Sequence, residues 1–292
     1  MDCRDLEIFL AVARHLNFTR AGEEMHLSQP SVSVRIRMLQ EELGVKLFEQ
    51  LGKKISMTEA GLVLERNARR IVSAFEDAQL AIQELKGLER GSLRIGASTT
   101  PGIYLVPKIV AEFKHQHPKI EIYVAIKDTR QVEELIVKNE FDFGFVGGHL
   151  IGYDVEVIPW RTDELALVVP VTHPLAARKR VKPRDLEKEL FIFREQGSAT
   201  QALVEGNLRA WELKVATVME TDNPGAVKQA VQAGLGIAFL SKFAIETELR
   251  TKTLATVRVE GLNARRELKI VYRKDKHLSL AAKAFIQACT ST

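Results

Sequence analysis

Residues 27–44, LSQPSVSVRIRMLQEELG, carry side chains whose type and spacing suit contact with DNA from one face of a helix. Four apolar residues recur at helical spacing, as in a helix packed on a core: Val32, Ile36, Leu39 and Leu43. The opposite face carries small and apolar residues with Arg37, where an ordinary solvent face would carry Lys and Glu. The major groove of DNA admits such a helix, because Arg can pair with guanine or a phosphate and apolar groups suit thymine methyls.

The residues expected to contact DNA lie on this face or on a hairpin that follows it. Gln29, at the helix start, can pair with adenine or a backbone oxygen, whereas Arg35 lies near the apolar stripe and more readily reaches a phosphate. Lys53 and Lys54, beside the expected hairpin tip at Gly52, would hold phosphates. The whole set is Gln29, Pro30, Ser31, Ser33, Val34, Arg35, Arg37, Lys53 and Lys54. The alternative is a helix-turn-helix that serves only as a packing unit, with its serines as ordinary caps.

Supporting elements must hold this face in place, and residues 1–58 predict three helices followed by a two-stranded wing. Ser28 can cap the third helix, Pro30 is acceptable in its first turn, and Gly44 ends it. Residues 1–60 carry eight basic and nine acidic side chains. DNA binding by this segment therefore depends on where its charges lie and not on their sum.

Residues 59–90 predict one long helix and a hinge. Apolar residues recur in it at alternating spacings of four and three, the heptad pattern of a helix–helix interface. They are Leu64, Ala68, Ile71, Phe75, Ala78, Ile82 and Leu85. A surface helix in a monomer shows part of such a pattern by chance, but this regularity between two domains favours an oligomer interface.

Residues 91–292 alternate strands and helices, which predicts parallel or mixed sheets covered by helices. The pattern divides into two similar lobes. We expect lobe I to hold residues 91–163 and 264–292, and lobe II to hold residues 164–263. The segment LALVVP, residues 165–170, is expected to begin the second set of strands.

Hydroxyl and glycine residues follow several of these strands. Backbone N–H groups and hydroxyls at strand ends suit a carboxylate or another small anion, and such ends converge in open α/β sheets. The candidate effector-binding residues are Ser98, Thr99, Thr100, Thr129, Gly147, Gln196, Ser198 and Thr200. Any one hydroxyl is better explained as a helix N-cap, so the prediction concerns the group. Residues 91–292 hold 29 basic and 24 acidic side chains, which favours an anionic ligand.

Other classes of protein find little support. The sequence contains no GxSxG, P-loop or dinucleotide-binding pattern, and His115 and His117 have no carboxylate or cysteine at metal-ligand spacing. The two cysteines, Cys3 and Cys289, lie near opposite ends of the chain and do not have metal-ligand spacing, which is typical of a protein in a reducing compartment. No basic leader or apolar run of ~20 residues occurs. We therefore expect a cytoplasmic protein that is not an enzyme, needs no cofactor or metal and does not enter the membrane.

The order of these parts resembles the LysR-type transcriptional regulators. The most specific segment is FTRAGEEMHLSQPSVSVRIRMLQEELGVKLFEQ with the later MTEAG, from Phe18 to Gly61. The resemblance implies an α+β multidomain fold: a winged helix-turn-helix, a long linker helix and a two-lobed α/β effector domain like periplasmic binding proteins. It further implies double-stranded operator DNA, RNA polymerase and a small-molecule effector as partners. The linker helix would form a homodimer, which family analogy extends to a homotetramer, and the cleft residues would be Ser98–Thr100, Thr129 and the Ser198 loop.

Some positions depart from the family pattern. Gly22 stands where a second alanine is usual and is expected to loosen its helix, Val34 occupies an often polar site, and Gln40 and Gln50 replace a common Glu and Arg. The rival classes are a solute-binding module, an enzyme on the same two-lobed fold and a scaffold that binds no nucleic acid. The first lacks an export signal, and the second lacks a base beside Ser98 or Thr99. Loss of DNA binding in Arg37→Ala would exclude the third.

Overall fold

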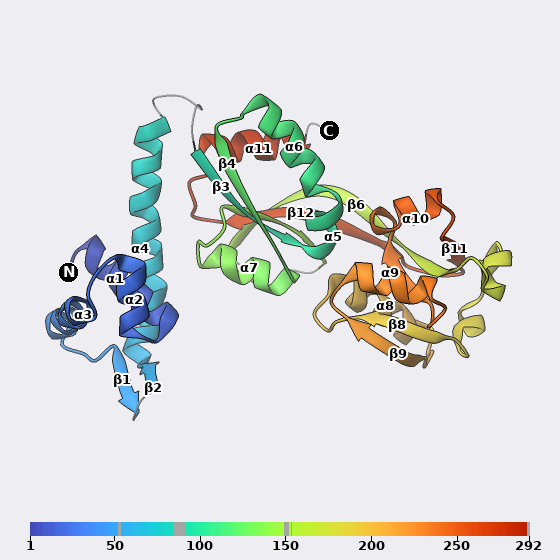
Figure 1. Cartoon of the computed structure of the whole chain (residues 1–292), viewed down its shortest axis with the longest axis horizontal. Coiled ribbons are helices and arrows are strands. Elements are labelled where there is room, and N and C mark those ends of the chain that lie inside the picture. The colour runs from blue at the N-terminus through green and yellow to red at the C-terminus, as the bar shows by residue number, and fades with distance from the viewer. Residues whose placement is uncertain (52–53, 85–90, 149–151, 153, 291–292) are drawn as a thin grey trace. The chain divides into compact units, whose positions relative to one another are not determined.

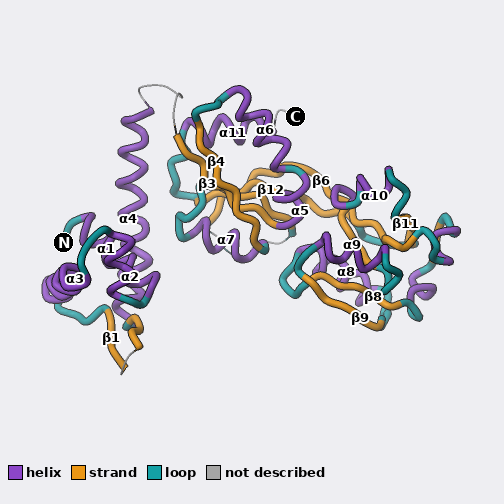
Figure 2. Tube along the Cα trace, in the orientation of Figure 1, coloured by secondary structure: helices purple, strands orange, loops and turns teal. Residues whose placement is uncertain are grey.

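The computed structural model describes residues 1–51, 54–84, 91–148, 152 and 154–290. The chain forms two compact units, Met1–Gly87 and Leu88–Thr292, and each has its own hydrophobic core. Figure 1 labels most of the helices and strands of both, and Figure 2 distinguishes helix, strand and loop by colour. Among the described residues, no helix combines the length and the apolar character that crossing a membrane requires.

The first unit is a helix-turn-helix followed by a hairpin and a long helix. Its elements are α1 (Cys3–His15), α2 (Phe18–Met25), α3 (Gln29–Leu43), β1 (Phe48–Leu51), β2 (Lys54–Met57) and α4 (Glu59–Glu84). The three helices and the wing predicted from the sequence are therefore confirmed. Phe9 in α1 packs against Phe48 in β1 with ring centroids 5.4 Å apart, which ties the hairpin to the helical core.

Local capping sets the helix ends in this unit. The Asn17 side chain accepts hydrogen bonds from two backbone N–H groups of α2, and Ser28 Oγ accepts one from the backbone N–H of Ser31. These contacts satisfy donors that the first helical turn leaves open. The cap after α3 is Gly44 at φ +68°, a left-handed conformation that glycine adopts without strain.

Two positions that depart from the family pattern have structural explanations. A Cβ on Gly22 would lie only 2.6 Å from the carbonyl oxygen of Leu27, so any side chain there would force α2 away from the turn. Glycine thus permits a tight turn instead of loosening the helix. Gln40 Oε1 accepts hydrogen bonds from the backbone N–H groups of Leu47, at 2.8 Å, and Phe48, at 3.3 Å, and so joins α3 to the start of the wing.

The second unit has two lobes that share one sheet path. Lobe I contains β3 (Gly91–Ser98), α5 (Thr99–Tyr104), α6 (Val106–Gln116), β4 (Ile120–Lys127), α7 (Thr129–Val137), β5 (Phe143–Gly147), β12 (Arg265–Arg273) and α11 (Leu280–Thr290). Strands β3, β4 and β5 are parallel, as the alternation of helix and strand predicts. In Figure 1, α6 and α11 lie together on one face of this sheet and α7 lies on the other.

The chain forms lobe II between β5 and β12. Its elements are η1 (Pro174–Ala177), β7 (Arg180–Val181), η2 (Pro183–Leu186), β8 (Leu190–Arg194), α8 (Ala199–Ala210), β9 (Ala216–Thr221), α9 (Pro224–Gln232), β10 (Ala238–Ser241), η3 (Lys242–Ala244), α10 (Glu246–Arg250) and β11 (Leu254–Val259). Helices α8 and α9 pack into two separate clusters of buried apolar residues, and β8 and β9 form a small parallel sheet.

The long strand β6 (Val155–Pro170) joins the lobes. The main sheet runs in the order β4-β3-β5-β12-β6-β11-β7, with β10 also paired to β6. The sequence predicted a strand only from residue 165, ten residues later than the observed start. Pro159 made the earlier part of β6 look unlike a strand in the sequence, because proline lacks a backbone N–H and is confined to strand edges and bulges. The register of β12 against β6 shifts between Leu268 and Lys269, opposite this position.

Candidate functional site

The exposed face of α3 is the first candidate surface. Val34 and Met38 are 42% and 61% exposed, and Pro30 and Arg37 are also exposed. Val32, Ile36 and Leu39 are buried in the domain core, as the apolar stripe predicts. Leu43, the fourth residue of that stripe, is 38% exposed at the end of the helix, so the prediction was wrong there. Within the described part of the chain, the Arg37 guanidinium has no hydrogen bond or ion pair. It is therefore available to an anionic or hydrogen-bonding partner.

The other predicted α3 residues already have partners in this chain. Gln29 Nε2 donates to Ser33 Oγ at 2.9 Å, and the hydroxyls of Ser28 and Ser31 are 2.8 Å apart. Both pairs can exchange these contacts for others at little cost, because they lie on the surface. Lys54 is exposed at the start of β2, and Lys53 lies outside the described residues.

Arg35 differs from Arg37 because it is held by α1. Its Nη1 donates to Asp5 Oδ1 at 2.8 Å. Partial burial of Asp5 opposes ionisation, yet the hydrogen bonds from Arg35 and from the Asp2 backbone lower the pKa of Asp5 overall. Arg35 thus stabilises the α1–α3 contact in the free chain, and a phosphate would have to compete with Asp5 for it.

Helix α4 has two apolar regions with different surroundings. Ala68 is fully buried and Leu64 partly buried in the core of the first unit, so this chain already covers them. Three of the predicted interface residues are exposed: Ile71 (47%), Phe75 (48%) and Ile82 (68%). Ala78 is exposed with them, and Leu85 lies outside the described residues. An exposed stripe of this size needs a cover.

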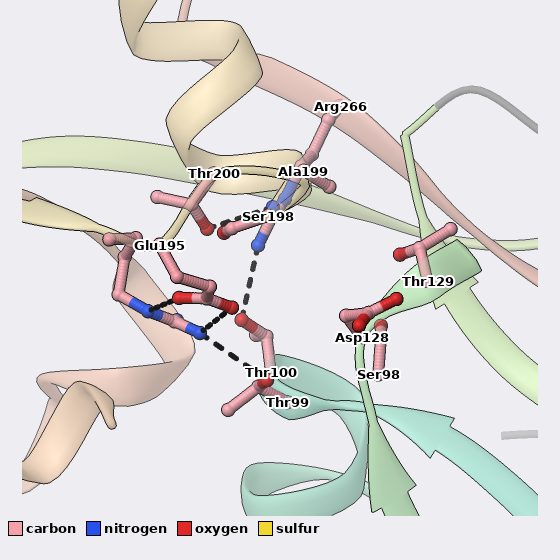
Figure 3. A pocket seen from close by; sticks show the side chains of 11 residues that line it. Ser98, Thr99, Thr100, Asp128, Thr129, Glu195, Ser198, Ala199, Thr200 and Arg266 are labelled. Atoms are coloured by element: carbon pink, nitrogen blue, oxygen red, sulfur yellow. Dashed lines mark hydrogen bonds and ion pairs between the residues drawn. The ribbon is translucent and has the colours of Figure 1, made fainter. Parts of the chain in front are cut away.

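The second candidate site is a pocket between the lobes of the second unit (Figure 3). It is lined by Ser98, Thr99, Thr100, Asp128, Thr129, Arg194, Glu195, Ser198, Ala199, Thr200 and Arg266. Lobe I supplies residues that follow β3 and β4, and lobe II supplies residues from the end of β8 and the start of α8. The enclosed volume is about 20 Å³, which is room for about one water molecule.

Arg266 ties the two walls of the pocket together. Its Nη1 donates to Thr200 Oγ1 at 3.0 Å in lobe II, and its Nη2 donates to Thr100 Oγ1 at 3.1 Å in lobe I. Its Nε donates to Asp163 Oδ2 at 2.8 Å, and Ser241 Oγ donates to Asp163 Oδ1 at 2.6 Å. Asp163 is completely buried, so its ion pair with Arg266 offsets the cost of placing a carboxylate away from water.

Arg194 forms the second charged group of the pocket. Its Nε and Nη2 donate to the two carboxylate oxygens of Glu195 at 2.8 and 2.9 Å, a bidentate ion pair. Nη2 also donates to Thr99 Oγ1 at 3.4 Å and to the Asp222 carbonyl at 2.9 Å. The Arg194 side chain is only 4% exposed, whereas that of Glu195 is 25% exposed. Glu195 thus occupies the place on Arg194 that an external anion could take.

The structure brings most of the predicted effector-binding residues together. Ser98, Thr99, Thr100, Thr129, Ser198 and Thr200 all line the pocket. Gly147 and Gln196 do not line it. The Gly147 carbonyl accepts a hydrogen bond from Thr129 Oγ1 at 3.0 Å, and Gln196 is exposed. Gly197, at φ +89°, reverses the chain after Gln196 so that Ser198 enters the pocket.

Residue patterns alone missed the charged members of the pocket. Arg194 ends the apolar strand LFIFR, where a basic residue in an otherwise apolar run was an available signal. Arg266 and Asp163 are register partners on β12 and β6 although about a hundred residues separate them in the chain. Nothing local in the sequence indicates that pairing, because it depends on how β12 returns to the sheet.

The start of α8 adds a further anion-binding feature. Ser198 caps this twelve-residue helix, and Ala199 and Thr200 in its first turn line the pocket. Backbone N–H groups in a first turn have no acceptor within the helix, and the helix dipole favours negative charge there. Together with two guanidiniums and several hydroxyls, this arrangement can hold a small anion. Among the described residues, no group of His, Cys, Asp and Glu side chains is placed to hold a metal ion.

Comparison with known sequences places both units in one family. Residues 3–62 match the bacterial regulatory helix-turn-helix proteins of the lysR family, and residues 86–292 match the LysR substrate binding domain. The RuBisCO operon transcriptional regulator of Allochromatium vinosum is 37% identical over 97% of this chain and 93% of its own length. The transcriptional activator CmpR of Synechocystis is 36% identical over 96% of this chain and 92% of its own length.

Solved structures share the fold of this chain. A full-length variant of OxyR from Pseudomonas aeruginosa has a TM-score of 0.78 at 21% identity and covers 100% of this chain and 94% of its own. CbnR complexed with its target DNA has a TM-score of 0.66 at 22% identity, with 99% of both chains covered. The Synechocystis CcmR regulatory domain in complex with 2-phosphoglycolate has a TM-score of 0.66 at 26% identity over 69% of this chain and 97% of its own.

Proposed function

This chain belongs to the LysR family of DNA-binding transcriptional regulators, and on that premise we propose which surfaces bind DNA, effector and a second copy of the chain. The protein would act in the cytoplasm, where its operator DNA and RNA polymerase are found. Its effector is a small anion held between the two lobes. The observation that carries this proposal is the pocket in which Arg194, Arg266 and the start of α8 converge.

The DNA-binding surface in this proposal is the exposed face of α3 with the β1–β2 wing. Arg37 is the residue for a guanine edge or a phosphate, because its guanidinium is exposed and free among the described residues. Gln29 and Ser33 can open their mutual hydrogen bond towards base edges, and Pro30 and Val34 offer apolar contact to thymine methyls. Ser31, Lys54 and Lys53, which lies outside the described residues, would contact the DNA phosphate backbone. Arg35 would do the same if it leaves Asp5.

The effector site in this proposal must change when a ligand enters. The pocket lining contains the acids Asp128 and Glu195 as well as Arg194 and Arg266, so it has no excess of positive charge. An anion therefore binds by replacing the Glu195 carboxylate on Arg194, which leaves Glu195 to turn towards solvent. The volume of about 20 Å³ also requires the walls to separate. Ligand binding would thus break the Arg194–Thr99 or Arg266–Thr100 ties between the lobes and alter their closure.

A ligand of the 2-phosphoglycolate class fits this chemistry. The CcmR regulatory domain, a structural relative, was solved in complex with that compound. A phosphate suits the Arg194 fork and the first turn of α8, and a carboxylate suits the hydroxyls around Arg266. The pocket supplies hydroxyl donors from Ser98 and Ser198 on its two sides.

The dimer interface in this proposal is the exposed half of α4. Ile71, Phe75, Ala78 and Ile82 supply a continuous apolar stripe, whereas Leu64 and Ala68 stabilise the fold of the same chain. Phe75→Glu should convert the dimer to a monomer in light scattering, because a carboxylate would be buried without a partner. Asn67→Glu, at an exposed position of the same helix, is the control and should leave the mass unchanged.

The decisive experiment for the effector is calorimetric titration of the full chain with 2-phosphoglycolate. Arg194→Gln should weaken binding at least about tenfold, because it removes charge-assisted hydrogen bonds of about 1.5–3 kcal/mol. Arg250→Gln carries the same charge change at an exposed position of α10 and should bind as the wild type does. Equal affinity for Arg194→Gln and wild type would overturn this choice of site.

The wild type could also fail to bind 2-phosphoglycolate. A thermal-shift screen of small carboxylates and phosphorylated metabolites then decides the ligand class, since a ligand at 100 times its Kd adds about 2.7 kcal/mol of stability. A complete absence of hits would overturn the effector proposal. Operator binding, measured by fluorescence anisotropy on fragments selected from genomic DNA, would still test the DNA surface independently.

A further inference from the structure

A second concave surface lies on lobe II beside the strands that join the lobes. This outer hollow has a volume of about 570 Å³. It is lined by Glu164, Leu165, Ala166, Lys242, Thr256, Val257, Arg258, Val259, Leu262, Asn263, Ala264 and Arg265. It has no residue in common with the pocket between the lobes, and it is many times larger.

The outer hollow and the pocket between the lobes are built from neighbouring residues of the same strands. In the register of β6 and β12, Asp163 is paired with Arg266 and Glu164 with Arg265. Successive side chains of a strand point to opposite faces, so the first pair serves the pocket and the second serves the outer hollow. Ser241 ends β10 and bonds Asp163, whereas Lys242 begins η3 and bonds Glu164 at 2.7 Å.

The charge of the outer hollow is unbalanced. Lys242, Arg258 and Arg265 face it, and Glu164 is the one acid among its lining residues. The pKa of Glu164 is lowered by the hydrogen bond from Lys242 and by the positive charges of Lys242, Arg265 and Arg258, although its partial burial acts in the opposite direction. All three cations therefore lie close enough to interact electrostatically with Glu164.

Two of these cations have no partner among the described residues. Lys242 is paired with Glu164, but the side chains of Arg258 and Arg265 have no hydrogen bond or ion pair among the residues that the structure describes. Arg180 on β7 is the register partner of Arg258 and adds positive charge to the same edge of the sheet. Like charges side by side repel one another, so an anion that binds between these cations lowers the free energy of the cluster.

The shape and the side chains of the hollow indicate the chemistry of that anion. A volume of about 570 Å³ lies within the ~300–1,000 Å³ usual for small-molecule sites. Guanidinium groups present planar forks that bind phosphate oxygens in pairs. Two free guanidiniums and a lysine require a ligand with at least two negative charges if Glu164 keeps its own charge.

We propose that the outer hollow is a second anion site, which binds a small phosphorylated ligand carrying at least two negative charges through Arg258, Arg265 and Lys242. Because Arg265 in the hollow and Arg266 in the pocket are neighbours on β12, paired with Glu164 and Asp163 on β6, occupancy of the hollow can be coupled to the pocket through these strands. Any such coupling is reciprocal, so each ligand would change the affinity of the other by the same factor. The site itself does not depend on the identity of the effector.

Calorimetric titration of the full chain with inorganic pyrophosphate tests the site. The variant Arg258→Gln/Arg265→Gln should bind pyrophosphate at least tenfold more weakly than the wild type, with an unchanged melting temperature because both side chains are exposed. Arg209→Gln/Arg250→Gln carries the same change of net charge at exposed positions outside the hollow and should bind as the wild type does. Arg194→Gln, in the pocket, should keep the pyrophosphate binding that Arg258→Gln/Arg265→Gln loses.

Four outcomes would overturn the proposal. One is no pyrophosphate binding by the wild type at millimolar concentration, and another is an equal loss in the two double variants, which would indicate non-specific charge attraction. The third is that Arg258→Gln/Arg265→Gln has no effect, while pyrophosphate binding is lost in Arg194→Gln or pyrophosphate is displaced by 2-phosphoglycolate. That result would place the anion in the pocket. The fourth is displacement of pyrophosphate by a random-sequence DNA duplex, with the displacement lost in the same double variant, which would assign the surface to nucleic acid.

Discussion

Arg37 on α3 and Arg266 on β12 are the same side chain in opposite surroundings. Arg37 is exposed and its guanidinium bonds no other described residue, whereas the Arg266 side chain is 8% exposed and bonds Asp163, Thr100 and Thr200. The exposed arginine can meet a polyanion without breaking anything in the protein. The buried arginine holds two lobes and a buried carboxylate together, so a ligand can reach it only by rearranging them.

The comparison separates two ways to use positive charge. In our proposal, the charge on α3 serves recognition and adds little to the free energy of unfolding. In the pocket it would serve stability and lobe closure first, and a ligand would bind by exchanging one set of partners for another. The following changes should reveal that division.

The largest effect is expected from Arg266→Met. Asp163 is completely buried, and removing its partner leaves an uncompensated charge, which typically costs about 3–5 kcal/mol. Both tryptophans, Trp160 and Trp211, lie in the second unit, so urea denaturation followed by tryptophan fluorescence reports on this domain. The double variant Arg266→Met/Asp163→Asn should recover part of the loss. If Arg266→Met unfolded at the same urea concentration as the wild type, Arg266 would not stabilise the fold and would not differ from Arg37 in this respect.

Arg37→Ala should act on binding and not on stability. Loss of a bidentate base contact typically costs about 1–3 kcal/mol, or about 5- to 150-fold in operator affinity, whereas exposed substitutions change stability by about 0.5 kcal/mol or less. Fluorescence anisotropy with the selected operator measures the first, and thermal denaturation measures the second. Arg250→Ala is the charge-matched control. If Arg37→Ala weakened all DNA sequences equally and reduced the salt slope by about one, Arg37 would contact a phosphate and not a base.

Glu195→Gln should strengthen effector binding. The amide cannot hold the Arg194 fork as a carboxylate does, so an incoming anion competes with a weaker internal partner. We expect about a tenfold lower Kd for 2-phosphoglycolate in calorimetry, since charge-assisted hydrogen bonds of about 1.5–3 kcal/mol are weakened and the pair is partly solvated. Glu187→Gln, at an exposed position of the same lobe, controls for net charge. Weaker binding in Glu195→Gln would instead make Glu195 a direct contributor to the ligand site.

Arg35→Gln should have the smallest effect and should depend on pH. The pKa of Asp5 is lowered in the folded chain, so the Arg35–Asp5 contact stabilises the fold above the ordinary pKa of Asp and loses that effect as pH falls through the lowered value. Because Arg35 is 44% exposed, the loss at pH 7 should be below about 1 kcal/mol. Thermal denaturation of wild type and variant at pH 7 and at about pH 3 should show a difference that shrinks in acid. A difference that grows in acid would contradict the assigned role of Asp5.

The first unit was largely predictable from the sequence because its signals are local. Asn17, Ser28 and Gly44 act within one helical turn of where they stand, and three of the four residues in the apolar stripe of α3 form its buried face. The split of the α4 heptad was not predictable in the same way. Periodicity shows that Ala68 and Phe75 share a face, but only the packing of α1 against α4 determines that the first is covered and the second is not.

The second unit was predictable in its alternation of strand and helix, and less so in its details. The sequence did not indicate the early part of β6, where Pro159 interrupts the strand pattern, or the strands β7 and β11. It did indicate the hydroxyls of the pocket, because Ser98, Thr129 and Ser198 each stand at a strand-to-helix turn. It included Gln196 for the same reason, although the turn at Gly197 leaves that side chain exposed.

The sequence by itself determined the helix-turn-helix and the exposed face with Arg37, since each depends on residues a few positions apart whose spacing matches a helical turn. The family was indicated by the resemblance of the run from Phe18 to Gly61 and of the order of the parts. The tertiary structure decided the charges of the pocket. Arg194, Arg266 and Asp163 come from β8, β12 and β6, and their contacts exist only after the chain has folded back on itself. Contacts within a turn are encoded by neighbours along the chain, whereas a buried ion pair between distant strands is set by sheet register, which no short segment contains.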